Sequence, residues 1–319
     1  MKIVILDGYT TDEGTLSWGE LAELGELTYY ERTLPEQRLE RAKDAEILIS
    51  NKVVLDKELL ENIPNLKYIG LLSTGYNIVD LDYAKSKNIP VCNIPDYSTK
   101  SVAQLTIALM LELTMAVGKH NASVVNGDWE RCKDFCYRVQ DIIELDGKTI
   151  GLIGYGSIAK EVAKIASALG MKVIANRRTP FTGDGIAQSV SLDTLFAQSD
   201  VISLHCPMNK DSDKMIDGKA IAKMKDGVII LNTARGGVVD EVALRQGLDS
   251  GKIGGYGADV LSSEPPKDNP LIGAPRCYIT PHIAWASIQA RTRLMRIAID
   301  NVKSYLDGKI KNCVYDIKR

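Results

Sequence analysis

The sequence predicts an α/β protein with two doubly wound parallel-sheet domains, and three observations lead to that fold class. Short apolar runs alternate with helical patterns from one end of the chain to the other, as in successive βαβ units. The chain has 319 residues, a length that corresponds to about two domains of ordinary size. A glycine-rich turn near the middle of the chain lies between a strand pattern and a helix pattern, where a second sheet would begin.

The composition is that of a globular protein without a strong charge bias. The chain is 45% hydrophobic and 25% charged, and its 39 basic and 41 acidic side chains give a net charge of −2. This balance provides no electrostatic footprint for nucleic acid or for an anionic membrane. The N-terminal segment lacks the features of a signal peptide, and no apolar stretch reaches the roughly 20 residues of a membrane span. We therefore expect no nucleic-acid partner and no membrane partner.

The six cysteines form neither a CxxC redox motif nor a recognisable zinc-ligand pattern. Scattered cysteines of this kind are typical of reduced thiols in a cytosolic protein. We therefore expect a cytoplasmic location and no bound metal.

The N-terminal third of the chain has the pattern of a complete sheet. Helical segments are predicted at Pro35–Lys43 and Asp80–Lys87, between apolar runs that are interpreted as strands. Because strands that alternate with helices pair in parallel, these runs predict one parallel sheet. The predicted strands are Ile3–Leu6, Leu27–Tyr30, Ile47–Ile49, Tyr68–Leu71 and Val91–Asn93.

A long helix is predicted after the first sheet. Ser98 is a candidate N-cap, and apolar residues run almost unbroken from Val102 through Val117. A helix that is apolar on most sides is buried, so we interpret it as the spine that joins the two domains. The segment 126–146 then loses its periodicity, and we expect it to run over the surface or toward a partner subunit.

The alternation of strands and helices starts again after this segment. The last predicted helix, Ala286–Leu306, follows a complete sheet and has no strand of its own to cover, so we infer that it returns to the first domain. The predicted domains are thus 1–98 with 286–319, and 99–285. The predicted strands of the second sheet are Thr149–Ile153, Lys172–Ala175, Val201–Leu204, Val228–Leu231, Gly255–Ala258 and Tyr278–Ile279.

The glycine-rich turn matches the pattern Gly-x-Gly-x-x-Ala between a strand and a helix, which is typical of dinucleotide-binding proteins. Gly154 permits the tight turn, Gly156 lets the backbone approach a pyrophosphate, and Ala159 keeps the helix close to the strand. The N–H groups at the start of that helix are suited to an anion. An ordinary glycine turn is the alternative interpretation. The residues predicted to contact a nicotinamide dinucleotide here are Gly154, Tyr155, Gly156, Ser157 and Ile158.

The next predicted strand bears on the choice of dinucleotide. NAD enzymes usually place an Asp or Glu about 20 residues after the turn, where it accepts a hydrogen bond from the ribose 2′-hydroxyl. This chain has Arg177 and Arg178 there instead, and guanidinium groups suit a 2′-phosphate. We therefore favour NADP(H) as the cofactor and keep NAD(H) as the alternative. A solvated basic loop is the competing interpretation of the two arginines.

The chain has three histidines, and two of them are interpreted as structural or as neighbours of the cofactor. His120 ends the predicted long helix and is interpreted as a structural residue. His205 lies at the end of a predicted strand, where the adjacent backbone is expected to approach the cofactor. Arg291 and Arg293, on the last predicted helix, are interpreted as part of a solvated face.

Three polar residues follow three predicted strands of the second sheet, which places them at its carboxyl edge, where open α/β sheets bind ligands. They are Arg235, Glu264 and His282. Such a set is complete for hydride transfer at a carbonyl. Arg235 would hold a substrate carboxylate and polarise the carbonyl, His282 would pass a proton to or from the hydroxyl, and Glu264 would orient the imidazole ring.

These motifs resemble the D-isomer-specific 2-hydroxyacid dehydrogenase family over essentially the whole chain. The matching segments are 154–159, 232–237, 259–266 and Pro281-His282. The resemblance implies a Rossmann cofactor domain inserted in a flavodoxin-like substrate domain, the three catalytic roles just given, a homodimer, and closure of the domains to exclude water from the reaction. It also implies that Asp259 contacts the nicotinamide carboxamide, that Cys206, Pro207, Thr233 and Ala234 line the cofactor, and that Ser73, Thr74 and Gly75 bind the substrate carboxylate.

Within the family, the segments around Glu264 and His282 look most like glycerate dehydrogenases (hydroxypyruvate reductases). Trp285 is then a candidate wall of the substrate pocket, with an aromatic packed between domains as the alternative. The expected substrate is a small 2-keto or 2-hydroxy acid, with hydroxypyruvate and D-glycerate favoured and glyoxylate possible. The alternatives are a D-lactate, formate or phosphoglycerate dehydrogenase and, from another class, a non-catalytic dinucleotide-sensing corepressor.

Overall fold

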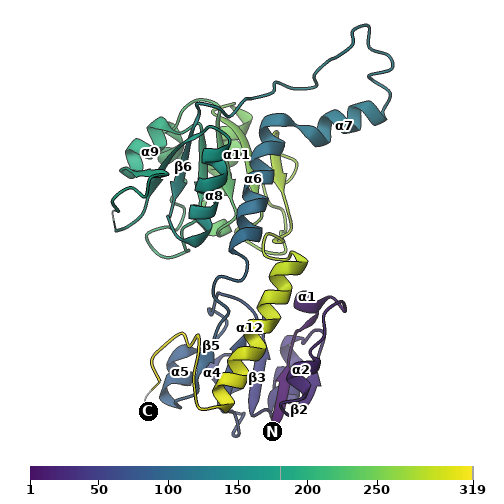
Figure 1. Ribbon diagram of the computed structural model, residues 1–319, viewed down its shortest axis with the longest axis vertical. Coiled ribbons are helices and arrows are strands. Elements are labelled where there is room, and N and C mark those ends of the chain that lie inside the picture. Colours follow the sequence, from purple (N-terminus) through teal and green to yellow (C-terminus); the bar gives the residue numbers. More distant parts are fainter. Residues whose placement is uncertain (180, 318–319) are drawn as a thin grey trace. The chain divides into compact units, whose positions relative to one another are not determined.

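The computed structural model describes residues 1–179 and 181–317, which form two compact units (Figure 1). Unit 1 contains Met1–Ser98 together with Ala286–Arg319, and unit 2 contains Thr99–Trp285. Each unit has a parallel β-sheet and helices that follow its strands. The predicted fold class, two doubly wound parallel-sheet domains, is therefore confirmed.

Unit 1 is built around a five-stranded sheet in the order β2-β1-β3-β4-β5, and every pair of neighbouring strands is parallel. This 2-1-3-4-5 order is that of flavodoxin-like folds. The strands are β1 Lys2–Ile5, β2 Glu26–Tyr29, β3 Ile47–Ser50, β4 Tyr68–Leu71 and β5 Val91–Cys92. The helical elements are α1 Tyr9–Asp12, α2 Gly19–Ala22, η1 Pro35–Gln37, α3 Arg38–Ala42, α4 Lys57–Leu60, α5 Leu81–Ser86 and α12 Ile288–Leu306.

Helix α12 packs against β4 and α1, although it lies about 190 residues beyond the rest of unit 1 in the sequence. Arg291 on this helix is 5% exposed, pairs with Glu13 at 3.2 Å and donates to the carbonyl of Thr11 at 3.3 Å. The interpretation of Arg291 as part of a solvated face was wrong, because its guanidinium fastens α12 to α1. The Nε atom of Arg293 donates to the carbonyl of Tyr97 at 2.9 Å, while its side chain remains largely exposed.

Unit 2 is built around a seven-stranded sheet in the order β12-β11-β10-β9-β6-β7-β8. Counted within the unit, this is the 3-2-1-4-5-6 order of the Rossmann fold with one further strand at the edge. The strands are β6 Thr149–Ile153, β7 Lys172–Asn176, β8 Ala187–Ser189, β9 Val201–Leu204, β10 Val228–Asn232, β11 Ile253–Ala258 and β12 Cys277–Ile279. The helical elements are α6 Thr99–Met115, α7 Val117–Val125, α8 Ser157–Ala168, α9 Leu192–Gln198, α10 Gly218–Lys223, η2 Gly236–Val238 and α11 Glu241–Asp249.

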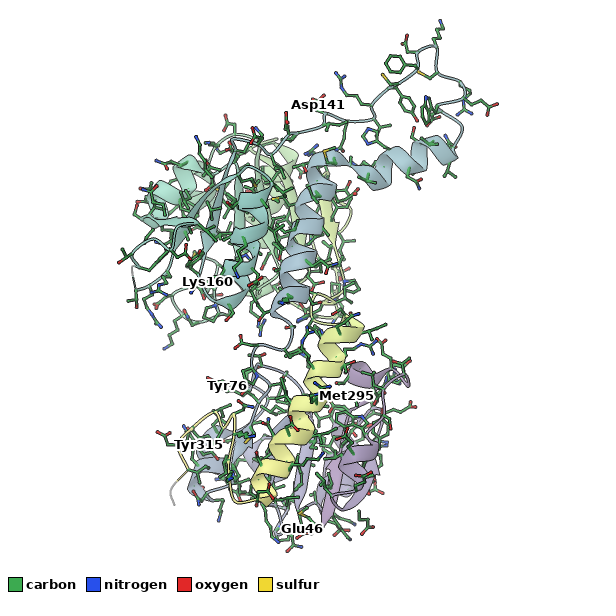
Figure 2. The ribbon with its side chains drawn as sticks, viewed as in Figure 1. Glu46, Tyr76, Asp141, Lys160, Met295 and Tyr315 are labelled. Atoms are coloured by element: carbon green, nitrogen blue, oxygen red, sulfur yellow. The ribbon has the colours of Figure 1, made fainter. Side chains whose placement is uncertain are left out.

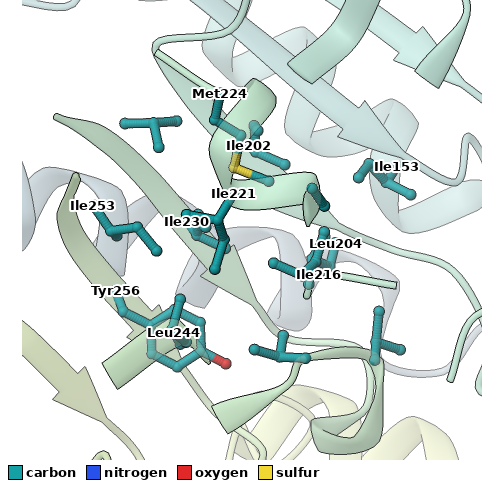
Figure 3. Close-up of a cluster of buried hydrophobic side chains, with 14 of the residues drawn as sticks. Ile153, Ile202, Leu204, Ile216, Ile221, Met224, Ile230, Leu244, Ile253 and Tyr256 are labelled. Carbon is teal, nitrogen blue, oxygen red and sulfur yellow. The ribbon is translucent and has the colours of Figure 1, made fainter. Parts of the chain in front are cut away.

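The central strands of unit 2 are apolar without interruption because helices cover both faces of the sheet. All residues of β9 and β10 are buried. On one face, Ile202 and Ile230 from these strands meet Ile221 of α10 and Leu244 of α11 in a cluster that also contains Tyr256 (Figure 3). On the other face, α6 packs against α8, β10 and β11. This core holds the carboxyl ends of the strands in a fixed relation to one another.

The helix predicted to continue through Val117 breaks one residue earlier. Ala116 has a φ of 50°, and the axes of α6 and α7 differ in direction by 56°. The carboxylate of Glu112 accepts a hydrogen bond from the N–H of Gly118 at 3.2 Å, which provides a partner for an amide at the start of α7. His120, which the sequence placed at the end of the long helix, therefore lies within α7.

Helix α7 and the irregular segment after it extend away from the sheet of unit 2 (Figures 1 and 2). None of the α7 residues is buried, and Val125, Trp129 and Phe135 are 79%, 53% and 89% exposed. Within the described ranges, no single helix is long and apolar enough to cross a membrane; α6 and α7 meet that test of length and composition only when taken together across their bend.

Candidate active site

The glycine turn after β6 has the geometry that a dinucleotide site requires. Gly154 has a φ of 87°, and a Cβ atom at this position would lie 2.6 Å from the carbonyl oxygen of His205. At Gly156 an added Cβ would meet no atom within 4 Å, so the backbone is open to a ligand. Among the described residues, no side chain caps the start of α8, which leaves its first N–H groups for an anion. These features fit a bound pyrophosphate.

The loop between β7 and β8 is attached to this turn by aromatic and polar contacts. Tyr155 stacks on Phe181 with ring centroids 4.7 Å apart, and its hydroxyl donates to Asp184 at 2.7 Å. Hydrogen bonds from the N–H of Ala187 and from this hydroxyl lower the pKa of Asp184 to about 2. Asp184 is therefore a carboxylate near the dinucleotide turn that the sequence did not reveal, because it lies well beyond the end of the strand.

Arg177 and Arg178 follow β7 and are both exposed. The Nε atom of Arg177 donates to the carbonyl of Thr179 at 2.6 Å, and its guanidinium carbon lies 5.2 Å from the ring centroid of Phe181. Arg178 makes no hydrogen bond or ion pair with another residue that the structure describes. Both guanidinium groups thus keep donors for a ligand at the β7 end of the turn.

The order of the strands reverses between β6 and β9, and this is the switch point at which open α/β sheets bind ligands. Gly154 and His205 follow these two strands. The imidazole of His205 is hydrogen-bonded to Ser203 at 2.9 Å, and burial lowers its pKa to about 4. His205 is therefore neutral near neutral pH and supports the turn through its backbone. Cys206 is partly buried and Pro207 is exposed beside it.

The low pKa of His205 predicts acid sensitivity. Unfolded His205 takes up a proton below pH 6.5, whereas the folded residue does so only near pH 4, so the free energy of unfolding falls as the pH decreases between these values. We expect a loss of about 3 kcal/mol at most from this group. Urea titrations from pH 7.5 to 4.5 measure it. An equal pH dependence in His205→Gln would contradict this assignment.

His282 and Glu264 form a direct pair. The Nδ1 atom of His282 lies 2.6 Å from Oε2 of Glu264, and both side chains remain about one-third exposed. The other carboxylate oxygen of Glu264 accepts a hydrogen bond from the N–H of Leu261 at 3.0 Å, which fixes the carboxylate. With Nδ1 occupied by the carboxylate, Nε2 is the nitrogen left for a substrate.

Asp259 positions the turn that carries His282. Its Oδ1 atom accepts hydrogen bonds from Thr280 at 2.5 Å and from the N–H of Ile283 at 2.9 Å, and Oδ2 accepts one from the N–H of Ala284 at 2.8 Å. Burial raises the pKa of this carboxyl. His282 itself has a φ of 55°, a conformation that the surrounding bonds must hold. Since each carboxylate oxygen has two acceptor positions, the bond from Ala284 leaves one acceptor position on Oδ2.

Arg235 follows β10 and is exposed. One terminal nitrogen donates to the carbonyl of Ala234 at 2.7 Å. The next residue, Gly236, brings this loop against the loop that carries Glu264, because a Cβ at Gly236 would lie 1.9 Å from the carbonyl carbon of Leu261. The loop after β10, which carries Arg235, and the loop after β11, which carries Glu264, therefore touch through their backbones.

This close approach predicts that Gly236→Ala disturbs both stability and activity. The added methyl group would overlap the Leu261 backbone, so we expect about 1–3 kcal/mol of destabilisation in urea titrations together with a loss of kcat. Gly218→Ala is the matched control, because a Cβ there meets no atom within 4 Å. If both variants were as stable as the parent, the contact between the two loops would be refuted.

The loops after β10 and β11 are held by Glu241 and Thr106, which the sequence did not single out. The carboxylate of Glu241 accepts hydrogen bonds from the N–H and the hydroxyl of Ser262 at 2.8 and 2.6 Å, and from Asn269 at 2.9 Å. The hydroxyl of Thr233 is hydrogen-bonded to that of Thr106 on α6 at 2.8 Å. Glu241 could have been noticed as an acidic residue in the first turn of a helix, but nothing in the sequence indicates which loop it contacts.

In unit 1, the loop Ser73-Thr74-Gly75 follows β4. The hydroxyl of Ser73 donates to the carbonyl of Gly75 at 2.7 Å, and that of Thr74 donates to the carbonyl of Ile94 at 2.7 Å. The side chain of Asn93 donates to the carbonyl of Thr74 at 2.8 Å. These bonds hold a tight loop whose backbone N–H groups at Thr74 and Gly75 donate to no other described group, an arrangement suited to a carboxylate.

The remaining predicted residues lie in unit 2. Trp285 is the last residue of unit 2, and its side chain is partly buried. Thr233 is buried and Ala234 is partly buried. Within the described residues, no group of three or more histidine, cysteine or acidic side chains is arranged to hold a metal ion.

Comparisons with known proteins agree on one family. Residues 107–284 match the family model described as "D-isomer specific 2-hydroxyacid dehydrogenase, NAD binding domain". A hydroxypyruvate reductase of Blautia hydrogenotrophica is 48% identical over 98% of this chain and 99% of its own length. A glycerate dehydrogenase of Methylorubrum extorquens is 42% identical over 98% of each chain. The solved structure of an acyclic imino acid reductase in complex with NADPH and D-Arg superposes with a TM-score of 0.87 at 33% identity, covering 99% of this chain and 100% of that one.

The glycine turn at the switch point, the histidine–glutamate pair and the arginine on the adjoining loop thus occur in a chain that matches this family along nearly its whole length. The chain belongs to the D-isomer-specific 2-hydroxyacid dehydrogenase family and is an NAD(P)-dependent oxidoreductase.

Proposed function

We propose that this protein interconverts hydroxypyruvate and D-glycerate, and that glyoxylate is a further substrate. The observation that supports this function best is the pairing of His282 with Glu264 at 2.6 Å, because the loop of Glu264 touches the loop of Arg235. An acid–base pair beside a guanidinium is the set of groups needed to reduce the keto group of a small acid. The names of the two relatives, hydroxypyruvate reductase and glycerate dehydrogenase, support this substrate.

In the proposed mechanism the nicotinamide, when bound, supplies the hydride. Residues of this chain bind the substrate, polarise its keto group and transfer the proton. Arg235 binds the substrate carboxylate through charge-assisted hydrogen bonds and polarises the keto group. In unit 1, the backbone N–H groups of Thr74 and Gly75 are suited to donate to a substrate carboxylate. Protonated His282 delivers a proton from Nε2 to the keto oxygen, and Glu264 keeps the ring oriented throughout.

Unit 2 is assigned to the cofactor and also carries Arg235 and Trp285, which are assigned to the substrate; unit 1 contributes the Thr74 loop. The turn Gly154–Ile158 holds the pyrophosphate on the N-terminus of α8. Asp259 offers its remaining acceptor position to the nicotinamide carboxamide, and Cys206, Pro207, Thr233 and Ala234 line the cofactor. Trp285 is assigned to the wall of the substrate pocket.

Initial rates with hydroxypyruvate, glyoxylate and pyruvate in turn, each with NADPH and with NADH, test the proposed function. We expect the highest kcat/KM with hydroxypyruvate, a lower value with glyoxylate and the lowest with pyruvate. A preference for pyruvate would favour a D-lactate dehydrogenase instead. No oxidation of either cofactor with any acid would refute the proposal and favour a non-catalytic, dinucleotide-sensing role.

We further propose that NADP(H) is preferred. Arg177 and Arg178 follow β7, and their guanidinium groups have N–H donors that bond to no described residue. The carboxylate of Asp184 accepts a hydrogen bond from the hydroxyl of Tyr155. The imino acid reductase structure contains NADPH, which is consistent with use of the phosphorylated cofactor on this fold.

The NADP(H) preference predicts the effect of Arg177→Ala. Loss of a charge-assisted hydrogen bond to the 2′-phosphate should raise KM for NADPH by about 10- to 100-fold and leave KM for NADH within about 2-fold. Arg296→Ala, a change of an exposed arginine on α12, is the matched control and should alter neither value. A parent enzyme that prefers NADH, or equal losses with both cofactors, would contradict the assignment.

We also propose that the protein is a homodimer and that it is located in the cytoplasm. The exposed apolar residues of α7 and the following segment, among them Val125 and Phe135, provide a surface that a second copy of the chain would cover. The six free cysteines fit a reducing compartment. Light scattering in solution measures the mass of the assembly, and a monomer would refute the dimer.

A further inference from the structure

Two cysteines that the proposed mechanism does not use face each other in unit 1. Cys92 is the last residue of β5, and Cys313 lies in the C-terminal segment 309–317 that follows α12. Cys92 and Cys313 form an isolated antiparallel β-bridge. Both are free thiols, Cys92 buried and Cys313 half-buried.

The hydrogen bonds around the bridge show which kind of antiparallel pair it is. The N–H of Asn93 donates to the carbonyl of Asn312 at 3.0 Å, and the N–H of Val314 donates to the carbonyl of Val91 at 2.9 Å. These bonds flank the two cysteines, which therefore form a non-hydrogen-bonded pair. Such pairs have Cα atoms about 4.5 Å apart and the closest side chains of an antiparallel ladder. That separation lies within the range a disulfide needs, about 4.4–6.8 Å.

The pKa values of the two thiols are shifted in opposite directions. The thiol of Cys92 donates a hydrogen bond to Cys313, and this bond, opposed by partial burial and assisted by neighbouring backbone N–H groups, lowers the pKa of Cys313 to about 6. The same hydrogen bond, together with burial, raises the pKa of Cys92. These opposite shifts make Cys313 the more easily deprotonated of the two thiols, and they leave Cys92 as the resolving thiol beside it.

The C-terminal segment is held by other contacts on both sides of the pair. Tyr315, labelled in Figure 2, donates from its hydroxyl to the carbonyl of Ile89, and the Lys85 ammonium lies 5.3 Å from the centroid of its ring. The side chain of Asn312 donates to Asn301 on α12 at 2.8 Å. A covalent bond at Cys313 would therefore fix a segment that is now held by non-covalent contacts alone.

The pair is also adjacent to the loop that we assign to the substrate carboxylate. Asn93 follows Cys92 directly, and its side chain donates to the carbonyl of Thr74 at 2.8 Å. The backbone carbonyl of Asn93 accepts a hydrogen bond from Asn301 at 3.1 Å. One short chain of hydrogen bonds thus joins the cysteine pair, α12 and the Thr74 loop.

We propose that Cys92 and Cys313 form a reversible disulfide that fastens the C-terminal segment to β5. The oxidant is a disulfide of low molecular mass, such as glutathione disulfide. The Cys313 thiolate attacks one sulfur of that disulfide, which forms a mixed disulfide and releases one glutathione thiolate. The Cys92 thiol then loses its proton and attacks the Cys313 sulfur, which forms the intramolecular bond and releases the second glutathione. Two protein thiols are oxidised and one glutathione disulfide is reduced to two glutathione molecules.

The test needs no substrate, so its outcome is independent of the proposed activity. The full-length protein is incubated with glutathione disulfide, remaining thiols are blocked with N-ethylmaleimide, and peptides are mapped by mass spectrometry. We expect one cross-linked peptide pair containing Cys92 and Cys313, with a mass lower by two hydrogen atoms than the sum of the reduced peptides. Dithiothreitol, added before the maleimide, should reduce the disulfide to two thiols, so that maleimide then blocks both cysteines.

Two variants complete the test. Cys313→Ser should abolish the cross-linked pair, whereas Cys132→Ser, a change of a free cysteine in the extended segment of unit 2, should leave it intact. Hydrogen exchange should slow by at least about 10-fold for amides of the segment 309–317 in the oxidised parent but not in oxidised Cys313→Ser. Blocking of Cys92 by maleimide after oxidation, or glutathione retained on Cys313 as the end product, would overturn the proposal.

Discussion

Replacing His282 by alanine should lower kcat for hydroxypyruvate reduction by about 10²- to 10⁴-fold, the usual contribution of a positioned general acid or base. The variant loses the only proton donor that the Glu264 carboxylate orients at 2.6 Å among the described residues. KM should change far less than kcat, because the proton moves in the transition state and not during binding. Steady-state rates over a range of hydroxypyruvate concentrations separate the two constants.

His120→Ala is the matched control for this variant. His120 lies on α7, where its Nδ1 atom is hydrogen-bonded to the carbonyl of Ala116 at 2.8 Å and Nε2 accepts from the N–H of Val139 at 3.3 Å. Its replacement should leave kcat within about 2-fold, since the ring supports the extended segment and not the reaction. A comparable loss in both variants, or less than about 10-fold in His282→Ala, would assign proton transfer to another group.

Replacing Arg235 by glutamine should lower kcat/KM by about 10³-fold, and here both constants should worsen. The guanidinium is proposed to bind the substrate carboxylate in the ground state and to stabilise charge on the keto oxygen in the transition state. Loss of the first interaction raises KM, and loss of the second lowers kcat. Steady-state rates with hydroxypyruvate measure both changes in the same experiment.

One further variant separates the charge of Arg235 from the geometry of its guanidinium, and a second variant is the control. Arg235→Lys keeps the charge but cannot form two parallel hydrogen bonds, so it should recover only part of the loss. Arg245→Gln removes an arginine that pairs with Asp249 at 2.8 Å on the surface of α11 and should leave kcat/KM unchanged. Full activity in Arg235→Lys would contradict bidentate binding, and full activity in Arg235→Gln would contradict the proposed role altogether.

The sequence predicted the elements whose residues carry strong local signals. The strands Tyr68–Leu71, Thr149–Ile153 and Val201–Leu204 have the predicted bounds, because a strand covered on both faces is a continuous apolar run with polar ends. The glycine turn was predicted because its conformation requires glycine: at Gly154 the backbone has positive φ and touches a neighbouring strand end.

The features that the sequence did not predict depend on contacts between distant residues. Strand β8 is short and only partly buried, so it has no apolar run. The break at Ala116 carries neither glycine nor proline, and its backbone conformation is visible only in the structure. Arg291 has the composition of a surface position, yet its ion pair with Glu13 depends on the return of α12 to unit 1.

In the candidate site, too, the sequence predicted the residues with local signals and missed the contacts between distant residues. Three strand ends of one sheet were enough to indicate Arg235, Glu264 and His282 as a group, because parallel strands present their carboxyl ends at one edge. The bonds that support the group, such as those that Asp259 accepts from Ile283 and Ala284, join residues 24 and 25 positions apart. No local pattern reports such pairs, so they could be found only from the folded chain.

Transfer of deuterium tests the central claim most directly. The enzyme is incubated with hydroxypyruvate and NADPH that carries deuterium at both C4 positions of the nicotinamide, and the glycerate formed is analysed by mass spectrometry and chiral chromatography. Hydride transfer to the keto carbon predicts D-glycerate with one deuterium at C2, and about 10²- to 10⁴-fold slower formation of this product with His282→Ala. Glycerate without deuterium, or of the L configuration, would contradict the account.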